Sequence, residues 1–191
     1  MALSEIADKR KFSGAVLFFG AMQFLLFVSI AEFVATNFSV SGNTISHLGI
    51  DNAPYIFDTT IIILGLAEIV TGYFLRGNFS KLFSIFLIIG GIGAIGVGIF
   101  NEDFGKIHLM FALLAFVFSS IGTYVIFFTK KKDMMTFMWA MMGTVALIAL
   151  ILYSSSMYLG LGKGGMERLI MYPNIIWALG FSASLYYGKW E

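Results

Sequence analysis

The side chains best suited to chemistry in this sequence lie mostly in or near the segments between long apolar runs. The candidate site residues carry imidazole, carboxyl, hydroxyl, amide or guanidinium groups: Asn43, Ser46, His47, Asp58, Glu102, His108, Glu167 and Arg168. Imidazole and carboxylate groups can transfer protons, or can hold a zinc ion with one position left open for water. These residue types therefore permit a hydrolytic, proton-transferring or ligand-binding site.

The spacing of these residues does not form a diagnostic catalytic motif. The sequence contains no H-E-x-x-H, H-x-x-x-H or G-x-S-x-G pattern, so the signatures of zinc peptidases and serine hydrolases are missing. Ser46 and His47 are adjacent, but adjacency alone does not make a nucleophile and its base. With no cysteine in the chain, thiolate metal sites and cysteine nucleophiles are excluded. We expect no metal and no cofactor, and we favour a non-catalytic role while leaving enzymatic activity open.

The elements that must position these residues are helices that cross a membrane. Hydrophobic residues make up 59% of the chain and charged residues 12%, with a mean hydropathy of +0.88, outside the range of soluble domains. A membrane-crossing helix needs about 20 apolar residues. Six runs approach or exceed this length, near 12–35, 55–75, 82–100, 108–128, 134–156 and 169–188.

These runs are continuous and do not alternate between apolar and polar residues, which favours helices over barrel strands. The sequence therefore predicts an all-α polytopic integral membrane protein. We expect a single transmembrane domain over residues 1–191, folded as an antiparallel bundle of six transmembrane helices.

The positions of lysine and arginine predict the orientation of the helices, because short cytoplasmic loops carry these residues in excess. One side of the predicted spans carries nine of them: Lys9, Arg10, Lys11, Arg76, Lys81, Lys130, Lys131, Lys132 and Lys189. The other side carries three: Lys106, Lys163 and Arg168. We therefore expect a cell-membrane protein with both termini in the cytoplasm. The polar stretch SGNTISHLGI at residues 41–50 then faces outward.

Four stretches of the chain are distinctive: GNTISHLG, IFDTTIIILGL, GVGIFNEDFGKIH and GGMERLIMYPNIIW. They resemble the domain-of-unknown-function 998 family of small bacterial and archaeal membrane proteins, and the similarity extends over roughly residues 15–188. The resemblance implies a fold of membrane helices in a prokaryotic protein and no established reaction. It implicates the residues that match the family pattern: Ser46, Leu48, Gly49, Gly98, Phe100, Glu102, His108, Glu167 and Trp177. The chain departs from that pattern at His47, Asp58 and Asn101.

The candidate residues are expected to form one polar cap, with SGNTISHLGI as its lid. The guanidinium group of Arg168 can bridge carboxylates, so we predict that it pairs with Asp58 or Glu102. Asn43 is expected to cap a short turn or helix that begins there. The alternative is structural, because polar side chains in a loop at the membrane surface also satisfy backbone groups.

Two features of the predicted spans have their own interpretations. Gly90, Ala94 and Gly98 recur every fourth residue, which predicts close packing of two helices. Glu68 lies deep in the second predicted span, where an unpaired charge is costly. It is expected to be protonated or hydrogen-bonded, and a proton-relay role stays open.

Three functions stay open at this point. The first is a structural or accessory protein, such as a small subunit of a membrane assembly. The second is an enzyme or binder that acts on a lipid or other amphipathic molecule at the outer leaflet. The third is a small proton-coupled transporter, which would show broken helices. Pro54 and Pro173 are expected at span edges, so the sequence gives no support for broken helices. Membrane lipids are the predicted partners, and other membrane subunits stay open as further partners. A net charge of +1 argues against nucleic acid.

Overall fold

The computed structural model describes residues 3–51, 54–77, 79–129 and 132–188. Lys130, Lys131 and Lys189 of the orientation argument lie outside these ranges. The elements follow one another as α1 (Leu3–Val34), η1 (Ser46–Gly49), α2 (Pro54–Leu75), α3 (Lys81–Ile99), η2 (Glu102–Phe104), α4 (Lys106–Thr129), α5 (Met134–Ser154) and α6 (Gly162–Tyr187), where η1 and η2 are short 3₁₀ helices. No strand occurs within the four ranges.

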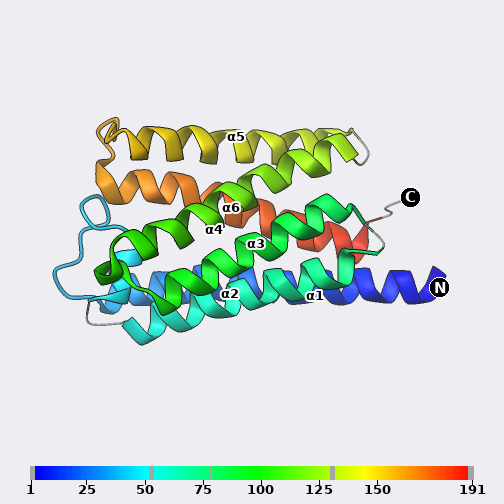
Figure 1. Cartoon of the computed structure of the whole chain (residues 1–191), viewed down its shortest axis with the longest axis horizontal. Helices are drawn as coiled ribbons and strands as arrows, with labels where there is room; N and C mark the ends of the chain where they lie inside the picture. The colour runs from blue at the N-terminus through cyan, green and yellow to red at the C-terminus, as the bar shows by residue number, and fades with distance from the viewer. Residues whose placement is uncertain (1–2, 52–53, 78, 130–131, 189–191) are drawn as a thin grey trace.

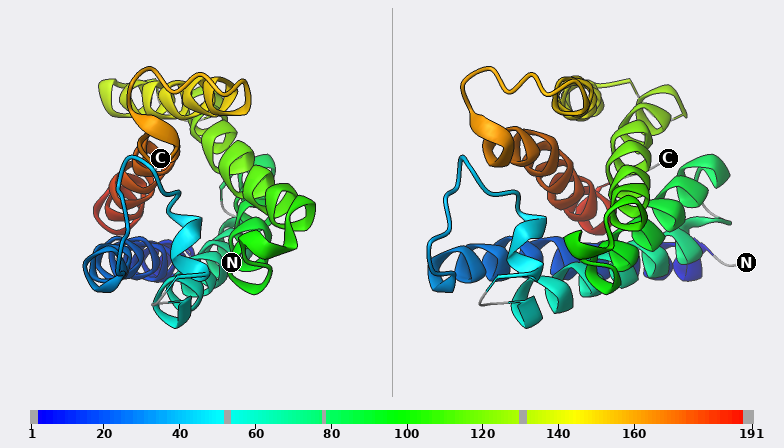
Figure 2. Two further views of the ribbon diagram at one scale, coloured as in Figure 1. Left: turned by 90° about the vertical axis from the view of Figure 1, so that its left-hand side faces the viewer. Right: turned by 60° about the vertical axis from the view of Figure 1, so that its left-hand side comes forward.

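All six α-helices are long and apolar enough to cross a membrane. The predicted all-helical fold with six spans is therefore confirmed, and the chain is a multi-pass membrane protein. The helices form a closed ring in which each one packs on the next along the chain and α6 returns to α1 (Figure 2). Helix α1 begins and α6 ends at the same end of the bundle (Figure 1). The opposite end carries the segments 35–51, 100–105 and 155–161.

Two predicted boundaries and the place of one proline were wrong. Helix α1 extends nine residues before the predicted start at 12, because its first turns leave the apolar run and are stabilised by polar pairs such as Lys9 with Glu5 at 2.8 Å. Helix α6 starts at Gly162 and not at 169, so Glu167 and Arg168 belong to its first turns. Pro173 lies inside α6 and not at its edge. The helix nevertheless continues through the proline, so it is not a broken helix.

Small residues allow α3 to approach both neighbouring helices closely, as the sequence predicted. A Cβ atom on Gly98 would lie 2.8 Å from the backbone oxygen of Asp58 on α2. A Cβ atom on Gly90 would lie 3.1 Å from the Ser119 hydroxyl on α4. Ala94, between these two glycines, is buried. Close helix packing at this face of α3 is therefore confirmed.

The aromatic core fills the end of the ring where α1 begins. Phe83 and Phe181 meet edge to face with ring centroids 5.0 Å apart, and Trp177 stacks on Phe181 at 5.6 Å. Trp139 from α5 contacts the same ring of Phe181. Large rings close this end of the bundle. The opposite end is closed by the polar segment between α1 and α2.

Candidate functional site

The segment 35–51 forms a lid over one end of the helix ring. A turn from Ser39 to Asn43 is closed twice: the Asn43 backbone N–H donates to the Ser39 carbonyl at 2.7 Å, and the Ser39 backbone N–H donates to the Asn43 side chain at 2.9 Å. Asn43 therefore closes a turn and does not cap η1, whose N-cap is Ile45. Leu48 in η1 is fully buried, which anchors the lid in the apolar interior.

Arg168 holds the lid to α1 and α6. Its Nη1, which carries two hydrogens, lies within hydrogen-bond distance of three backbone carbonyls, those of Val40 at 2.8 Å, Asn43 at 3.1 Å and Gly164 at 2.9 Å. Its Nε donates to the Glu32 carboxylate at 3.1 Å, and its Nη2 contacts the same oxygen. We call this group, made of Glu32, Val40, Asn43, Gly164 and Arg168, the Arg168 clasp. The guanidinium is buried, and every one of its nitrogens has a partner.

Gly164 is required by the close approach of the lid to α6. A Cβ atom on this residue would lie 2.5 Å from the Val40 carbonyl oxygen and would also overlap the Asn43 carbonyl. The Gly164 backbone N–H donates to the Ser41 carbonyl at 2.8 Å. The lid therefore uses the first turn of α6, where backbone N–H groups have no partner within the helix.

Beside the clasp, two glutamates converge on the other half of the lid. The Ser46 hydroxyl lies 2.6 Å from Glu102 Oε1 and 3.2 Å from Glu167 Oε1. The Thr44 hydroxyl donates to Glu102, and the Ile45 backbone N–H donates to Glu167. His47 Nδ1 lies 3.2 Å from Glu102 Oε2. We call this group the Glu102–Glu167 cluster; it consists of Thr44, Ile45, Ser46, His47, Glu102 and Glu167.

The environment of Glu102 favours its ionised form. Burial by itself raises the pKa of this carboxyl group. Hydrogen bonds from the two hydroxyls and from His47, together with the positive charge of Lys163, outweigh burial and hold the pKa below its ordinary value of 4.5. At neutral pH the cluster therefore carries at least one negative charge.

The two carboxyl groups can accept more hydrogen bonds than the lid donates. Each carboxylate offers about four acceptor positions. The lid supplies the Thr44 and Ser46 hydroxyls, the Ile45 N–H and one nitrogen of His47. Ser46 has a single hydroxyl hydrogen, so it can donate to only one glutamate at a time. Acceptor capacity is left over for a group that enters from outside the cluster.

A cavity of about 510 Å³ opens beside the cluster, between α4, α5 and α6. Its polar wall is formed by Ser46, Glu102, His108, Tyr153, Lys163 and Glu167. Its apolar wall is formed by Leu109, Ala112, Leu113, Phe116, Leu150 and Ile170. The volume is within the range of about 300 to 1,000 Å³ that is common for small-molecule sites. One side of this cavity thus suits a polar group and the other suits hydrocarbon.

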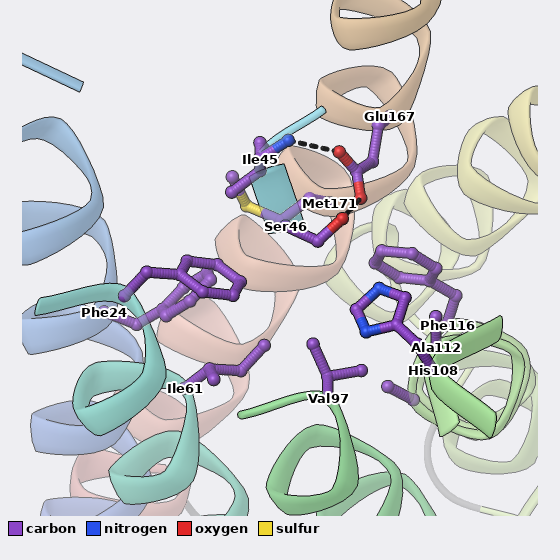
Figure 3. A pocket seen from close by; sticks show the side chains of 12 residues that line it. Phe24, Ile45, Ser46, Ile61, Val97, His108, Ala112, Phe116, Glu167 and Met171 are labelled. Atoms are coloured by element: carbon purple, nitrogen blue, oxygen red, sulfur yellow. Dashed lines mark hydrogen bonds between the residues drawn. The ribbon is translucent and has the colours of Figure 1, made fainter. Parts of the chain in front are cut away.

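His108 points from α4 towards Ser46 and Glu167 (Figure 3). Its Nδ1 lies 2.7 Å from the Phe100 carbonyl oxygen, which can only accept, so Nδ1 carries a hydrogen. In the neutral ring Nε2 is then the basic nitrogen. The Ser46 hydroxyl, within the described residues, bonds to glutamates and to neither histidine. The arrangement is therefore not a serine nucleophile activated by histidine.

The structure divides the eight predicted site residues into three groups. Ser46, His47, Glu102 and Glu167 form the cluster, and His108 lines the cavity next to it. Asn43 and Arg168 belong to the clasp. The predicted pairing of Arg168 with Asp58 or Glu102 was wrong: the partner is Glu32, which α6 reaches because the ring closes on α1.

Asp58 stands apart from both groups. It lies beneath the lid, where a Cβ atom on Gly49 would be 2.7 Å from its Oδ1. That oxygen is buried without a hydrogen-bond partner in the described structure. The predicted single cap is therefore two hydrogen-bonded groups and one separate acid.

Sequence reasoning did not assign site roles to several residues that shape this region. Thr44 lies between two predicted site residues, and its hydroxyl group could have assigned it to the site as well. Tyr153 and Lys163 line the cavity, but neither stands in a motif. Glu32 was visible only as an acid near the end of a span. Among the described residues, no group of three histidine or acidic side chains is arranged to hold a metal ion.

The model of one family, described as "Protein of unknown function (DUF998)", matches residues 18–184. The match covers well over half of the 191 residues, and the chain belongs to this family. The comparison with curated proteins found no match, and the comparison with solved structures also found none. The resemblance seen in the sequence is thus confirmed, while the prokaryotic origin stays a prediction.

Proposed function

We propose that this membrane protein of the DUF998 family binds an amphipathic molecule with an amine-bearing head group. The head group would face Glu102 and Glu167, and the hydrocarbon part would lie along α4 and α5. The observation that carries the proposal is the cavity of about 510 Å³, which has the carboxyl groups of two glutamates on one wall and leucine, phenylalanine and isoleucine side chains on the other.

The free acceptor capacity of the cluster supports an amine as the recognised group. A protonated amine has hydrogens for both carboxyl groups and carries the opposite charge, so its hydrogen bonds are charge-assisted. The rings of Tyr153 and Tyr158, whose centroids are 6.0 Å apart, also line the cavity and can face a cation. Lys163 at the exposed rim can meet an anionic group of the same molecule, so a zwitterionic lipid fits the pattern of charges.

Exposed leucines in the apolar wall support entry from the membrane. Leu109 is 53% exposed and Leu113 is 39% exposed, and both belong to α4, a membrane-crossing helix. A ligand with a hydrocarbon tail can keep that tail among lipids while its head group reaches the cluster. The bias of basic residues supports an orientation in which this end of the bundle lies at the outer leaflet.

The structural or accessory role favoured by sequence alone stays a prediction. The Arg168 clasp is sufficient to hold a purely structural lid. A cavity with unused acceptor groups does not stabilise such a lid. We therefore rank ligand binding first.

The proposal is tested by lipid binding to the purified full chain in nanodiscs, measured by native mass spectrometry. The probes are phosphatidylethanolamine, which carries an amine, phosphatidic acid, which lacks it, and diacylglycerol, which has no charge. We expect binding of the amine lipid and weaker binding of this lipid in Glu167→Gln. Asp103→Asn is the matched control, because Asp103 is an exposed acid in the same region.

Three outcomes decide between the possibilities. Equal retention of all three lipids would show that the head group is not recognised. Retention of none would remove the binding function and leave the structural role. Equal effects of Glu167→Gln and Asp103→Asn would show that the cluster is not the site.

The orientation is tested with single cysteines, because the chain has none of its own. An impermeant thiol reagent applied to intact cells should label Asp51→Cys in the lid and should not label Lys132→Cys at the opposite end. Labelling of Lys132→Cys alone would invert the assignment and place the cavity at the inner leaflet.

A further inference from the structure

Glu68 is an acid in the interior of the ring that the proposed binding function does not use. It lies on α2 and is 7% exposed. Its Oε2 has no hydrogen-bond partner in the described structure. A cavity of about 50 Å³ lies against it, lined also by Phe24, Phe116, Ser119 and Asn174. The carboxyl group therefore borders a small cavity, and its Oε2 is not bonded to another side chain.

The backbone of Gly90 leaves room between Glu68 and α4. A Cβ atom on Gly90 would lie 3.4 Å from Glu68 Oε2 and 3.1 Å from the Ser119 hydroxyl oxygen. The missing side chain thus keeps open a space with a carboxyl group on one side and a hydroxyl on the other. A cavity needs roughly 10 to 15 Å³ for one water molecule. The space at Glu68 is large enough for water to bond to both groups.

The surroundings of Glu68 provide no charge to balance an ionised carboxylate. The cavity wall contains Phe24 from α1, Ala94 from α3, Ser119 from α4 and Asn174 from α6. Among the described residues of this wall, Glu68 is the only titratable group. An unpaired carboxylate in such a setting loses its hydration without compensation. The neutral carboxyl group is the form that fits this space.

The cavity at Glu68 is the last in a series that begins at the cluster. A second cavity, of about 40 Å³, lies between and is lined by Ser46, His108 and Glu167. It shares Phe24, Phe116 and other wall residues with the cavity at Glu68. It shares His108, Glu167 and Phe116 with the large cavity. Phe116 therefore lines all three spaces, and it is the side chain that their walls have in common.

From this arrangement we propose that Glu68 is a proton-binding site inside the membrane and exchanges its proton with Glu167 and His108 through the series of cavities. The titratable groups along this series are Glu68, His108, Glu167 and, at the open end, Glu102, Tyr153, Tyr158 and Lys163. The inference does not depend on lipid binding, because it concerns the cavities below the cluster.

Infrared spectroscopy of the full chain in lipid tests the proposal. The carbonyl stretch of a protonated carboxyl group is separate from that of a carboxylate, and it shifts when deuterium replaces the proton. We expect a protonated-carboxyl band at neutral pH that is lost in Glu68→Gln. In D₂O this band should shift in the wild-type protein.

Matched variants test the route. Phe116→Ala removes the shared ring and should make the shift severalfold faster. Phe118→Ala is its control, because Phe118 packs on Phe86 and lines none of the three cavities. Gly90→Ala fills the space beside the carboxyl group and should make the shift slower.

Each other result overturns a stated part of the proposal. If Glu68→Gln removes no band, Glu68 is ionised and is not a stored proton. If the band is present but unaffected by D₂O, Glu68 is an isolated structural acid. If Phe116→Ala and Phe118→Ala change the rate equally, the proton does not pass through this series.

Discussion

The Arg168 clasp and the Glu102–Glu167 cluster hold the same lid, but they differ in how fully their polar groups are used. Every nitrogen of the Arg168 guanidinium has an acceptor on the lid, on α1 or on α6. The glutamates of the cluster share a few donors and border a cavity of about 510 Å³. A buried group with all partners supplied by the protein fastens the fold. A group with free acceptor capacity beside open space is suited to a ligand.

The largest expected effect is the loss of the clasp. Arg168→Ala leaves Glu32 without its partner, and removing one partner of a buried ion pair costs about 3 to 5 kcal/mol. We expect the free energy of unfolding, measured in mixed micelles, to fall by this amount. Lys106→Ala, an exposed cation at the same end, should be close to neutral. A loss below about 1 kcal/mol for Arg168→Ala is the value typical of solvated surface pairs. It would contradict the statement that the clasp fastens the fold.

A smaller loss is expected when the lid is pushed away from α6. Gly164→Ala places a methyl group 2.5 Å from the Val40 carbonyl oxygen, and overpacking costs about 1 to 3 kcal/mol. Gly165→Ala is the matched control, since its Cβ would meet only Leu161 at 3.0 Å. It should be neutral or slightly stabilising, as alanine favours helix more than glycine does. The same unfolding measurement on both variants decides, and equal stability would show that the lid does not depend on this contact.

Substitutions in the Glu102–Glu167 cluster should change lipid affinity more than protein stability. Glu167→Gln keeps an oxygen to accept from the Ile45 N–H but removes the ionisable carboxyl group that an amine would meet. We expect the dissociation constant for phosphatidylethanolamine to rise about tenfold, which corresponds to about 1.4 kcal/mol. The thermal midpoint should change little. If Glu167→Gln lowers stability strongly and leaves lipid affinity unchanged, the cluster has a structural role like that of the Arg168 clasp.

The smallest effect concerns pH. Because the pKa of Glu102 is lowered in the folded protein, its ionised form stabilises the fold at pH values above the ordinary value of 4.5. This contribution is lost as the pH falls from 4.5 through the lower pKa of the folded state. The difference in unfolding free energy between the wild type and Glu102→Gln should therefore shrink in that window. A difference that is constant from neutral pH downward would contradict the assignment.

The sequence was sufficient for the six spans because hydrocarbon length and continuous apolar runs determine them directly. It misplaced the start of α6 because GKGGMER contains no apolar run. Those residues are helical where the lid packs on Gly164 and where Arg168 reaches buried acceptors. Such stabilisation comes from contacts far away along the chain, which apolar counting does not detect.

The sequence placed Ser46, His47, Glu102 and Glu167 in one region through their loops and span ends. It could not show which acidic residue forms the ion pair with Arg168. Glu32 lies 136 residues earlier, and the two meet only because α6 packs on α1. Nor could it show that Phe116 lines three cavities, since a single phenylalanine in a span has no distinguishing pattern.

The closure of the ring by α6 has a consequence for biosynthesis. Chains are made from the N-terminus, so Glu32 enters the membrane long before Arg168 has been translated. Until α6 is inserted, the lid has neither Gly164 to rest on nor a guanidinium to hold its carbonyl groups. A nascent chain released before α6 would expose an unpaired acid and a half-formed cavity to the bilayer, where quality-control proteases could recognise it. The lid and the cavity beside the cluster can therefore form only after α6 has been translated and inserted.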